Sequence, residues 1–238
     1  MVLESLSFPT RAHRQALETV LRDADADSDV CGVLVCGSIA RGDALPGSDL
    51  DVRVFLHDDA SERAFNARDI GGIWVEITAR TVAKAQARLQ ERPIEVYPYL
   101  EAVVLRDEGG AVQMLVQQAR AIYDFYRATD ADRDEWRYWL QSTERKLHAA
   151  QSAQMWEKCA YLTATSSWPL LSGLWTAANR PLLPSGAVRF FLPDVCARIP
   201  SLTPQLVWEV FRGATVEART EAFLLVLHRI LPLLESPG

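Results

Sequence analysis

The stretch CGVLVCGSIARGDALPGSDLDVRVF, residues 31–55, organises the chain. One apolar run ends in Gly37-Ser38 and a second apolar run follows Asp49-Leu-Asp51. Both runs are typical of buried strands. Side chains two positions apart in a strand point to the same face, so Asp49 and Asp51 should lie side by side. Adjacent carboxylates repel each other, and a divalent cation can neutralise such a pair. The pair therefore predicts a metal site.

The Gly37-Ser38 turn predicts a second part of the same site. Glycine lets the backbone approach a ligand closely, and N–H groups at a turn that enters a helix bind anions. We expect Ser38 to cap the short helix that follows. Arg41, in the first turn of that helix, either reaches phosphate oxygens or pairs with Asp43. A phosphate-binding turn beside metal-binding carboxylates is suited to displacement at phosphorus.

The combined pattern, Gly-Ser-x-Ala-Arg-Gly at 37–42 and Ser-Asp-x-Asp at 48–51, resembles the signature of the polymerase-β-like nucleotidyltransferases. It is similar in character to the minimal and aminoglycoside-type branches, which carry a C-terminal helical domain. The dinucleotide-binding fingerprint is excluded, because Gly37 and Gly42 do not match its Gly-x-Gly-x-x-Gly spacing. In the first part of the chain the resemblance rests on the motif. In the second part it rests only on the expected all-helical structure.

This resemblance implies the residues of the site. Asp49 and Asp51 would hold one or two Mg²⁺ ions, and Glu76 would be the third carboxylate, as metal ligand or as general base. If Glu76 serves only the metal, Glu144 or Glu157 would supply the base. The co-substrate would be ATP or another nucleoside triphosphate. The residues assigned to nucleotide and phosphate binding are Gly37, Ser38, Arg41, Ser48, Lys146 and Lys158. For each lysine, a position on a solvated outer face is the alternative.

The pattern of elements predicts an α+β chain. A mixed β-sheet nucleotidyltransferase domain over residues 1–128 should be followed by an all-helical bundle over residues 129–238, the expected acceptor-substrate domain. The polar run 129–135 predicts the linker, and its acids also suit the N-terminus of a following helix. The stretch 179–193, with three prolines, predicts a long ordered loop. A helix should begin after Pro9-Thr10, and Gly71-Gly72 should close a hairpin. Further expected elements are strands over 30–36, 64–69, 73–78 and 102–105, and helices over 82–91 and 111–126.

Composition limits the classes of binding partner and the cellular compartments that we expect for this protein. The formal charge of −6 argues against nonspecific binding to nucleic acid, which needs basic patches. Four cysteines without paired spacing fit a reducing compartment, so we expect a cytoplasmic protein. We expect no secretion signal, because residues 1–9 lack a basic start and an apolar stretch, and no membrane span, because the apolar stretch 222–234 is too short. The oligomeric state stays open, and a homodimer is compatible with the sequence.

The main functional hypothesis is transfer of a nucleoside monophosphate, AMP from ATP, to a hydroxyl of a small molecule such as an aminoglycoside-like antibiotic. Such an enzyme would confer antibiotic resistance. A second hypothesis is a regulatory enzyme that modifies a protein, as AMPylating or toxin–antitoxin-type nucleotidyltransferases do. A third, a nucleotide-binding module without activity, is disfavoured because Asp49, Asp51 and Glu76 are all present.

Overall fold

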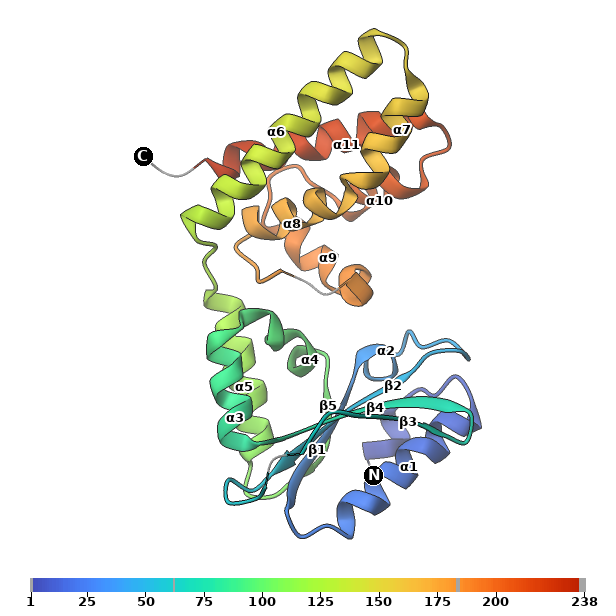
Figure 1. Ribbon diagram of the computed structural model, residues 1–238, viewed down its shortest axis with the longest axis vertical. Coiled ribbons are helices and arrows are strands. Elements are labelled where there is room, and N and C mark those ends of the chain that lie inside the picture. The colour runs from blue at the N-terminus through green and yellow to red at the C-terminus, as the bar shows by residue number, and fades with distance from the viewer. Residues whose placement is uncertain (1, 62, 183–184, 236–238) are drawn as a thin grey trace. The chain divides into compact units, whose positions relative to one another are not determined.

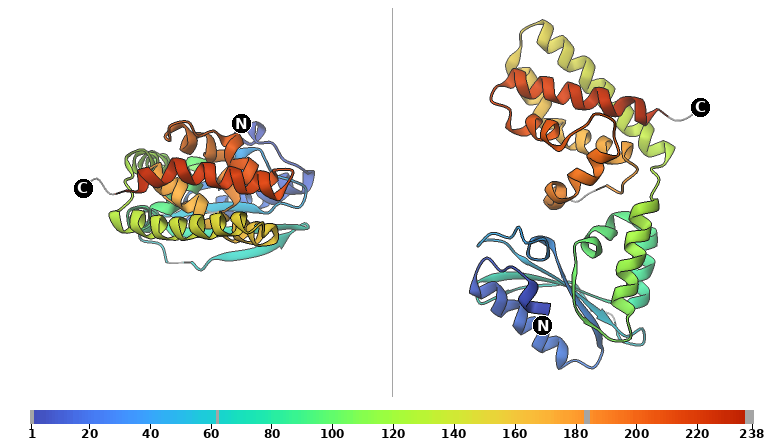
Figure 2. Two further views of the ribbon diagram at one scale, coloured as in Figure 1. Left: turned by 90° about the horizontal axis from the view of Figure 1, so that it is seen from above. Right: turned by 180° about the vertical axis from the view of Figure 1, so that it is seen from behind.

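The computed structural model describes residues 2–61, 63–182 and 185–235. The chain separates into two compact units, residues 1–125 and 126–238, which are drawn in Figures 1 and 2. The predicted domain boundary, after residue 128, lies three residues beyond this division. The first unit combines a sheet with helices, and the described residues of the second form helices without strands. The predicted α+β class is confirmed.

The first unit is built on a five-stranded mixed sheet with the strand order β3-β4-β2-β1-β5. Strands β2 and β4 run parallel, whereas β1 pairs antiparallel with β2 and β5, and β3 pairs antiparallel with β4. The strands are β1 (Val30–Cys36), β2 (Leu50–Leu56), β3 (Asn66–Ile70), β4 (Ile73–Thr81) and β5 (Val103–Asp107). The predicted strands are therefore present, with ends that differ by a few residues.

Two of these strands carry the signature stretch. All seven residues of β1 are buried, as expected for a strand with neighbours on both sides. In β2 the even-numbered residues 50–56 are buried among apolar side chains, while Asp51 and Arg53 on the other face are only partly buried. The parallel register with β4 places Asp51 beside Glu76. The two faces of β2 thus separate the apolar core from the charged side chains.

Helices cover both faces of the sheet. On one face α1 (Arg11–Asp25), capped by Thr10, packs through Leu17 and Val20 against β1, β2 and β4. On the other face α3 (Val82–Glu91) contacts β2 and β4, and α5 (Ala111–Phe125) contacts β1 and β5. The remaining helical elements of this unit are η1 (Val2–Ser5), α2 (Gly37–Arg41), η2 (Pro93–Val96) and α4 (Tyr97–Leu100). The sheet is therefore sandwiched, and α2 lies at one end of β1 and β2 (Figure 1).

The second unit is a bundle in which α6 packs against α7, α8 and α11. Its helical elements are α6 (Asp130–Ser152), α7 (Trp156–Thr165), α8 (Ser167–Ala177), η3 (Ser185–Ala187), α9 (Val188–Ala197), α10 (Pro204–Arg212), α11 (Val216–Ile230) and η4 (Leu231–Leu234). Leu140, Thr143 and Leu147 on α6 are buried, as their spacing predicts. None of the helices in the described ranges combines the length and the hydrophobicity that a membrane span requires.

Two expectations for the second unit are wrong. The run 129–135 is not a linker, because Thr129 and Asp132 form a capping box and α6 starts at Asp130. The stretch 179–193 is not a continuous loop, because α9 starts at Val188 and contains Pro193 in its interior. Burial of an apolar face that includes Phe191 and Val195 outweighs the hydrogen bond that this proline cannot donate.

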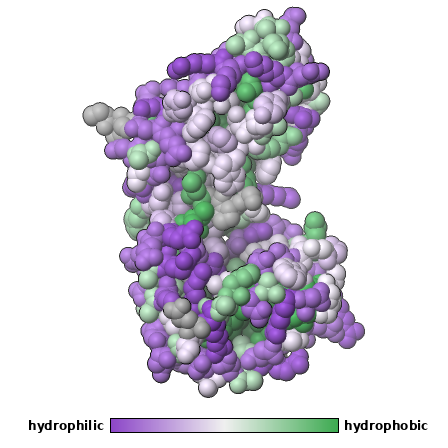
Figure 3. All heavy atoms as spheres, in the orientation of Figure 1, coloured by the Kyte–Doolittle hydropathy of each residue, from purple (hydrophilic) through white to green (hydrophobic). Residues whose placement is uncertain are grey.

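Hydrophilic side chains cover most of the face drawn in Figure 3, and hydrophobic side chains appear on it only in patches. One group of buried apolar residues in the first unit lies between α1 and the sheet. Others, such as Leu89, Tyr97 and Leu115, lie in α3, α4 and α5. All four cysteines are buried and free, as expected for a reducing compartment.

Candidate active site

The predicted turn and one predicted carboxylate touch each other. Cys36, the last residue of β1, lies opposite Asp51 in the antiparallel pair with β2. The next residue, Gly37, has a φ of +68°, in the left-handed region that favours glycine. A Cβ atom on Gly37 would lie 2.1 Å from Oδ2 of Asp51, well inside van der Waals contact. Both the backbone angle and the space available therefore require glycine, and the acid lies directly against the turn.

The three acids of the predicted metal site come from adjacent segments. Asp49 is exposed and directly precedes β2, Asp51 is partly buried within β2, and Glu76 is partly buried in β4. Burial raises the pKa of Asp51 to about 6, and the negative charges of Asp49, Glu76 and Glu101 add to the rise. Asp51 is therefore the centre of an acidic cluster, for which the charge of Arg41 compensates only in part.

The ligand oxygens of these three acids are not gathered as tightly as a shared ion would hold them. Among the described residues, the one group of three potential ligands whose atoms all lie within 4.8 Å of one another belongs to the second unit. Like charges repel each other, so a closer grouping of Asp49, Asp51 and Glu76 needs a cation between them. Their side chains would have to move to share one ion.

A fourth acid, Glu101, occupies the donors that were predicted to bind phosphate. The backbone N–H of Gly37 donates to Oε1 of Glu101 at 2.8 Å, and Nη1 of Arg41 donates to Oε2 at 2.8 Å. Arg41 also pairs with Asp43 at 3.2 Å, which was the predicted alternative. The side chains of Arg41 and Glu101 are only 8% and 6% exposed, so this is a buried ion pair. The turn thus already binds an anion, supplied by the chain itself.

The prediction that Ser38 caps the short helix is wrong. Helix α2 starts at Gly37 with Cys36 as N-cap, so Ser38 lies inside the helix and makes no capping hydrogen bond. Its hydroxyl is buried, and within the described part of the chain it has no hydrogen-bond partner. An unsatisfied buried hydroxyl carries a free-energy cost, so it is available to a ligand at the turn.

A buried histidine from α1 holds the loop that carries the signature acids. Nε2 of His13 donates to the carbonyl of Ser48 at 3.0 Å, and the Thr10 hydroxyl lies 2.8 Å from Nδ1. Because a carbonyl can only accept, Nδ1 of the neutral ring is the acceptor for Thr10. The Ser48 hydroxyl accepts from the N–H of Leu45 at 2.9 Å, within the turn before β2. Ser48, predicted to bind phosphate, is thus engaged in fixing this turn.

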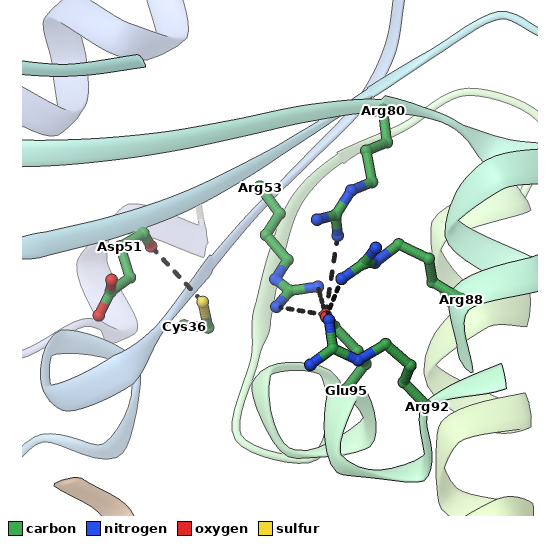
Figure 4. Close-up of polar contacts among 7 residues, drawn as sticks. All are labelled: Cys36, Asp51, Arg53, Arg80, Arg88, Arg92 and Glu95. Atoms are coloured by element: carbon green, nitrogen blue, oxygen red, sulfur yellow. Dashed lines mark hydrogen bonds and ion pairs between the residues drawn. The ribbon is translucent and has the colours of Figure 1, made fainter. Parts of the chain in front are cut away.

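Further along the same face of the sheet, four arginines surround a single carboxylate, that of Glu95 in η2 (Figure 4). The shortest nitrogen–oxygen distances to Glu95 are 2.7 Å from Arg88, 3.4 Å from Arg53, 3.7 Å from Arg80 and 4.0 Å from Arg92. Burial works to raise the pKa of Glu95, but the hydrogen bond from Arg88 and the arginine charges together lower it. This arginine cluster is thus a second charged region of opposite sign.

The remaining predicted residues belong to the second unit. Lys146 on α6 and Lys158 on α7 are exposed, as is Glu157. Glu144 accepts a hydrogen bond from His228 at 2.8 Å and is partly buried. Their assignment to phosphate binding or base catalysis stays a prediction.

Sequence reasoning did not find Glu101, His13 or Glu95. The contact from Gly37 to Glu101 spans 64 residues and that from His13 to Ser48 spans 35, so no local spacing reveals either. Arg53 could have been placed, because its position two residues after Asp51 puts both on one face of β2.

The comparisons with known proteins agree with the motif. Residues 15–106, which include the turn and all three predicted acids, match the family model described as a nucleotidyltransferase domain. No curated protein matches the chain. Among solved structures, a nucleotidyltransferase-like protein from Exiguobacterium sibiricum 255-15 is 14% identical with a TM-score of 0.37, covering 92% of this chain and 74% of that chain. The family match confirms the resemblance for this part of the chain: residues 15–106 form a nucleotidyltransferase domain, of the kind that transfers a nucleoside monophosphate.

Proposed function

We propose that the protein transfers AMP from ATP, with Mg²⁺, to a hydroxyl group of a small molecule. The observation that carries this proposal is the acidic cluster around Asp51, placed directly against the Gly37 turn. A cluster of like charges at a turn rich in N–H donors is suited to a ligand that brings both a cation and an anion. A nucleoside triphosphate bound with a divalent metal is such a ligand.

The donor set fits magnesium. Asp49, Asp51 and Glu76 offer only carboxylate oxygens, the ligands that hard divalent cations prefer. The pKa of Asp51 is raised first by burial and then by the negative charges of its neighbours, which Arg41 offsets only in part. These three residues would hold one or two Mg²⁺ ions, with Glu76 alternatively acting as general base for the acceptor hydroxyl. When bound, the metal supplies charge neutralisation at the transferred phosphorus and its leaving group.

The contacts of Glu101 support the proposal that the phosphates bind at the Gly37 turn. The N–H of Gly37 and the guanidinium of Arg41 are already directed at two carboxylate oxygens. Phosphate oxygens can accept from the same donors once the side chain of Glu101 moves aside. The unpartnered hydroxyl of Ser38, within the described residues, would be a third donor. Glu101 thus acts as an internal substitute for the phosphate.

The acceptor would bind with the help of the helical second unit, for which the chain has about 110 residues, an ordinary size for one domain. Lys146 and Lys158 would contribute positive charge toward the leaving pyrophosphate, as the family resemblance implies. An aminoglycoside-like acceptor is favoured because such compounds are polycationic and the chain carries a net charge of −6.

The proposal is tested by incubating the intact protein with each of the four α-labelled nucleoside triphosphates, Mg²⁺ and a panel of aminoglycosides and other polyols. We expect labelled drug and released pyrophosphate, with ATP as the best donor and no turnover in the presence of a chelator. Label on a protein instead of a small molecule would favour the protein-modifying alternative. Turnover that persists in the Asp49→Ala and Asp51→Ala variants would contradict the metal assignment.

A further inference from the structure

A cluster of three potential metal ligands lies in the second unit. Glu144 and His148 are four residues apart on α6, so their side chains lie one turn apart on the same face of the helix. His228 comes from the last turn of α11, which packs against α6. One ligand atom from each residue lies within 4.8 Å of the other two. Two helices far apart in sequence therefore bring these groups together.

The cluster is already partly organised. Nε2 of His228 lies 2.8 Å from Oε1 of Glu144, and the rings of His148 and His228 are stacked at 23° with centroids 6.4 Å apart. Four ligand atoms arranged tetrahedrally around an ion at about 2.1 Å would lie about 3.4 Å from each other. The spacing here is at most 4.8 Å, and exposed side chains can rotate to reach the shorter value. His148 is exposed and His228 is 52% exposed.

No basic side chain competes for the carboxylate. In the ranges that the structure describes, neither a lysine nor an arginine lies within ion-pair distance of Glu144; its partner is His228. Because both histidines are exposed, water can reach the open coordination positions of a bound ion. Two imidazoles, one carboxylate and a water form a ligand set that zinc accepts in proteins.

The donor chemistry separates this cluster from the acidic cluster of the first unit. Imidazole nitrogen favours Zn²⁺, Cu²⁺, Ni²⁺ and Co²⁺, whereas sites made only of oxygen favour Mg²⁺ and Ca²⁺. We propose that Glu144, His148 and His228 bind one first-row transition-metal dication, with Zn²⁺ as the representative, and that this ion joins α6 to α11. None of its ligands belongs to the acidic cluster, so zinc binding can be measured separately from nucleotide transfer.

The test uses the full chain, freed of metal with a chelator, in a buffer with excess Mg²⁺ to occupy the acidic cluster. Zinc binding is measured by isothermal titration calorimetry and by equilibrium dialysis, and the unfolding midpoint is followed with and without Zn²⁺. We expect one Zn²⁺ per chain and a rise in Tm of roughly 5 °C, because an ion that binds only the folded state stabilises it.

The chain has only four histidines, which gives matched variants. His148→Ala and His228→Ala should each weaken zinc binding roughly 10- to 100-fold, as expected for loss of one ligand or its partner. His57→Ala is the control, because His57 is 49% exposed and lies near Glu108 in the first unit. It should bind Zn²⁺ like the unaltered protein. All variants should have the same Tm in chelator, since the replaced side chains are exposed.

Two results would overturn the proposal. One is unchanged zinc stoichiometry in the His148→Ala/His228→Ala double variant, which would place the ion elsewhere. The other is the absence of binding at micromolar Zn²⁺ in the unaltered protein. Neither result bears on nucleotide transfer, which is measured separately with Mg²⁺.

Discussion

Two charged regions on one face of the first unit's sheet differ in what lies at their centre. In the arginine cluster the central group, Glu95, is a single negative charge surrounded by positively charged arginines. In the acidic cluster the central group, Asp51, is surrounded by other carboxylates, those of Asp49, Glu76 and Glu101. The pKa of Glu95 is lowered and that of Asp51 is raised. The first arrangement stabilises the fold, and the second has the uncompensated charge that the proposed metal would neutralise.

The excess positive charge around Glu95 is reduced by contact with solvent more than the negative charge at Asp51 is. Arg88 is 33% exposed and Arg92 is 57% exposed, so their charges are partly solvated. Burial, with the neighbouring charges of Arg88 and Arg53, lowers the pKa of Arg80. Asp51 gains less from water, because burial is the main cause of its raised pKa. The burial of the central carboxylate and the sign of its neighbours thus separate the arginine cluster from the proposed active site.

Loss of the central acid should give the largest effect on activity. Asp51→Asn should lower kcat/KM for nucleotide transfer by on the order of 10³-fold, because it removes a proposed metal ligand that acts on developing charge. Pyrophosphate release with ATP and Mg²⁺ measures the change. Asp59→Asn is the matched control, since Asp59 is an exposed acid outside the cluster. Equal activity of the two variants would remove the functional contrast between the clusters.

Loss of the central acid of the arginine cluster should give the largest effect on stability. Glu95→Gln should lower the free energy of unfolding by about 2–3 kcal/mol, because it leaves Arg53, only 15% exposed, without its carboxylate. Urea denaturation at pH 7 measures this. Arg92→Gln, whose guanidinium is 57% exposed and 4.0 Å from Glu95, should change stability by less than about 0.5 kcal/mol.

The same substitution is informative at low pH. Since the pKa of Glu95 in the folded protein lies below its unfolded value, its contribution is fully present above about pH 4.3 and is lost as the pH falls through the folded value. The difference in stability between Glu95→Gln and the unaltered protein should therefore shrink below that pH. A difference that does not shrink as the pH falls below about 4.3 would contradict the ion-pair account.

In contrast, Asp51→Asn should stabilise the metal-free protein. The pKa of Asp51 is about 6 in the folded protein, above its unfolded value, so the folded state binds more protons between about pH 4 and 6. Stability of the unaltered protein therefore falls as the pH rises through this range. Since Asp51 is partly solvated, we expect a gain for Asp51→Asn of on the order of 1–2 kcal/mol at pH 7 and none at pH 4.

Thermal unfolding in chelator, at both pH values, measures this gain. Added Mg²⁺ should raise the Tm of the unaltered protein at pH 7 and have little effect on Asp51→Asn. A variant that is less stable than the unaltered protein at pH 7 without metal would show that Asp51 is satisfied in the fold, as Glu95 is.

The smallest effect concerns Glu101, which bridges the acidic cluster and the turn. Glu101→Gln keeps one acceptor oxygen, which can serve either Gly37 or Arg41, replaces the other oxygen with an amide donor, and removes one negative charge near the proposed phosphate site. We expect the KM for ATP to fall roughly threefold, equivalent to about 0.7 kcal/mol, with kcat little changed. Initial rates over a range of ATP concentrations measure both constants. A rise in KM would mean that Glu101 holds Arg41 in place for the nucleotide and does not compete with it.

Sequence predicts those parts of this protein that depend on local spacing. The strands, the Gly71-Gly72 hairpin and α3 follow from alternation, turn residues and helical periodicity, and they are present. The proximity of Asp51 and Glu76 follows from the pairing of two parallel strands. The start of α6 was misplaced because its polar first turn, with the capping pair Thr129 and Asp132, has the composition of a linker.

Other parts of the site depend on long-range packing. His13 is buried because α1 lies on the sheet, and only this packing brings its ring to Ser48. Glu101 is placed by α4 and β5, and nothing in its neighbouring residues marks it as the partner of Gly37. The two clusters could not be told apart from sequence, because the identity of the central residue depends on burial.

The thiol of Cys36 has a consequence for metal choice. It lies opposite Asp51, donates to the Asp51 carbonyl at 3.8 Å, and burial raises its pKa to about 12. A protonated sulfur is a poor ligand, since metals bind the thiolate. Soft toxic cations such as cadmium would therefore gain no anchor one residue from the turn, and alkylating reagents should leave this position intact. The fold thus places a thiol next to the acids but keeps it protonated, so that it neither binds metals nor reacts as a nucleophile.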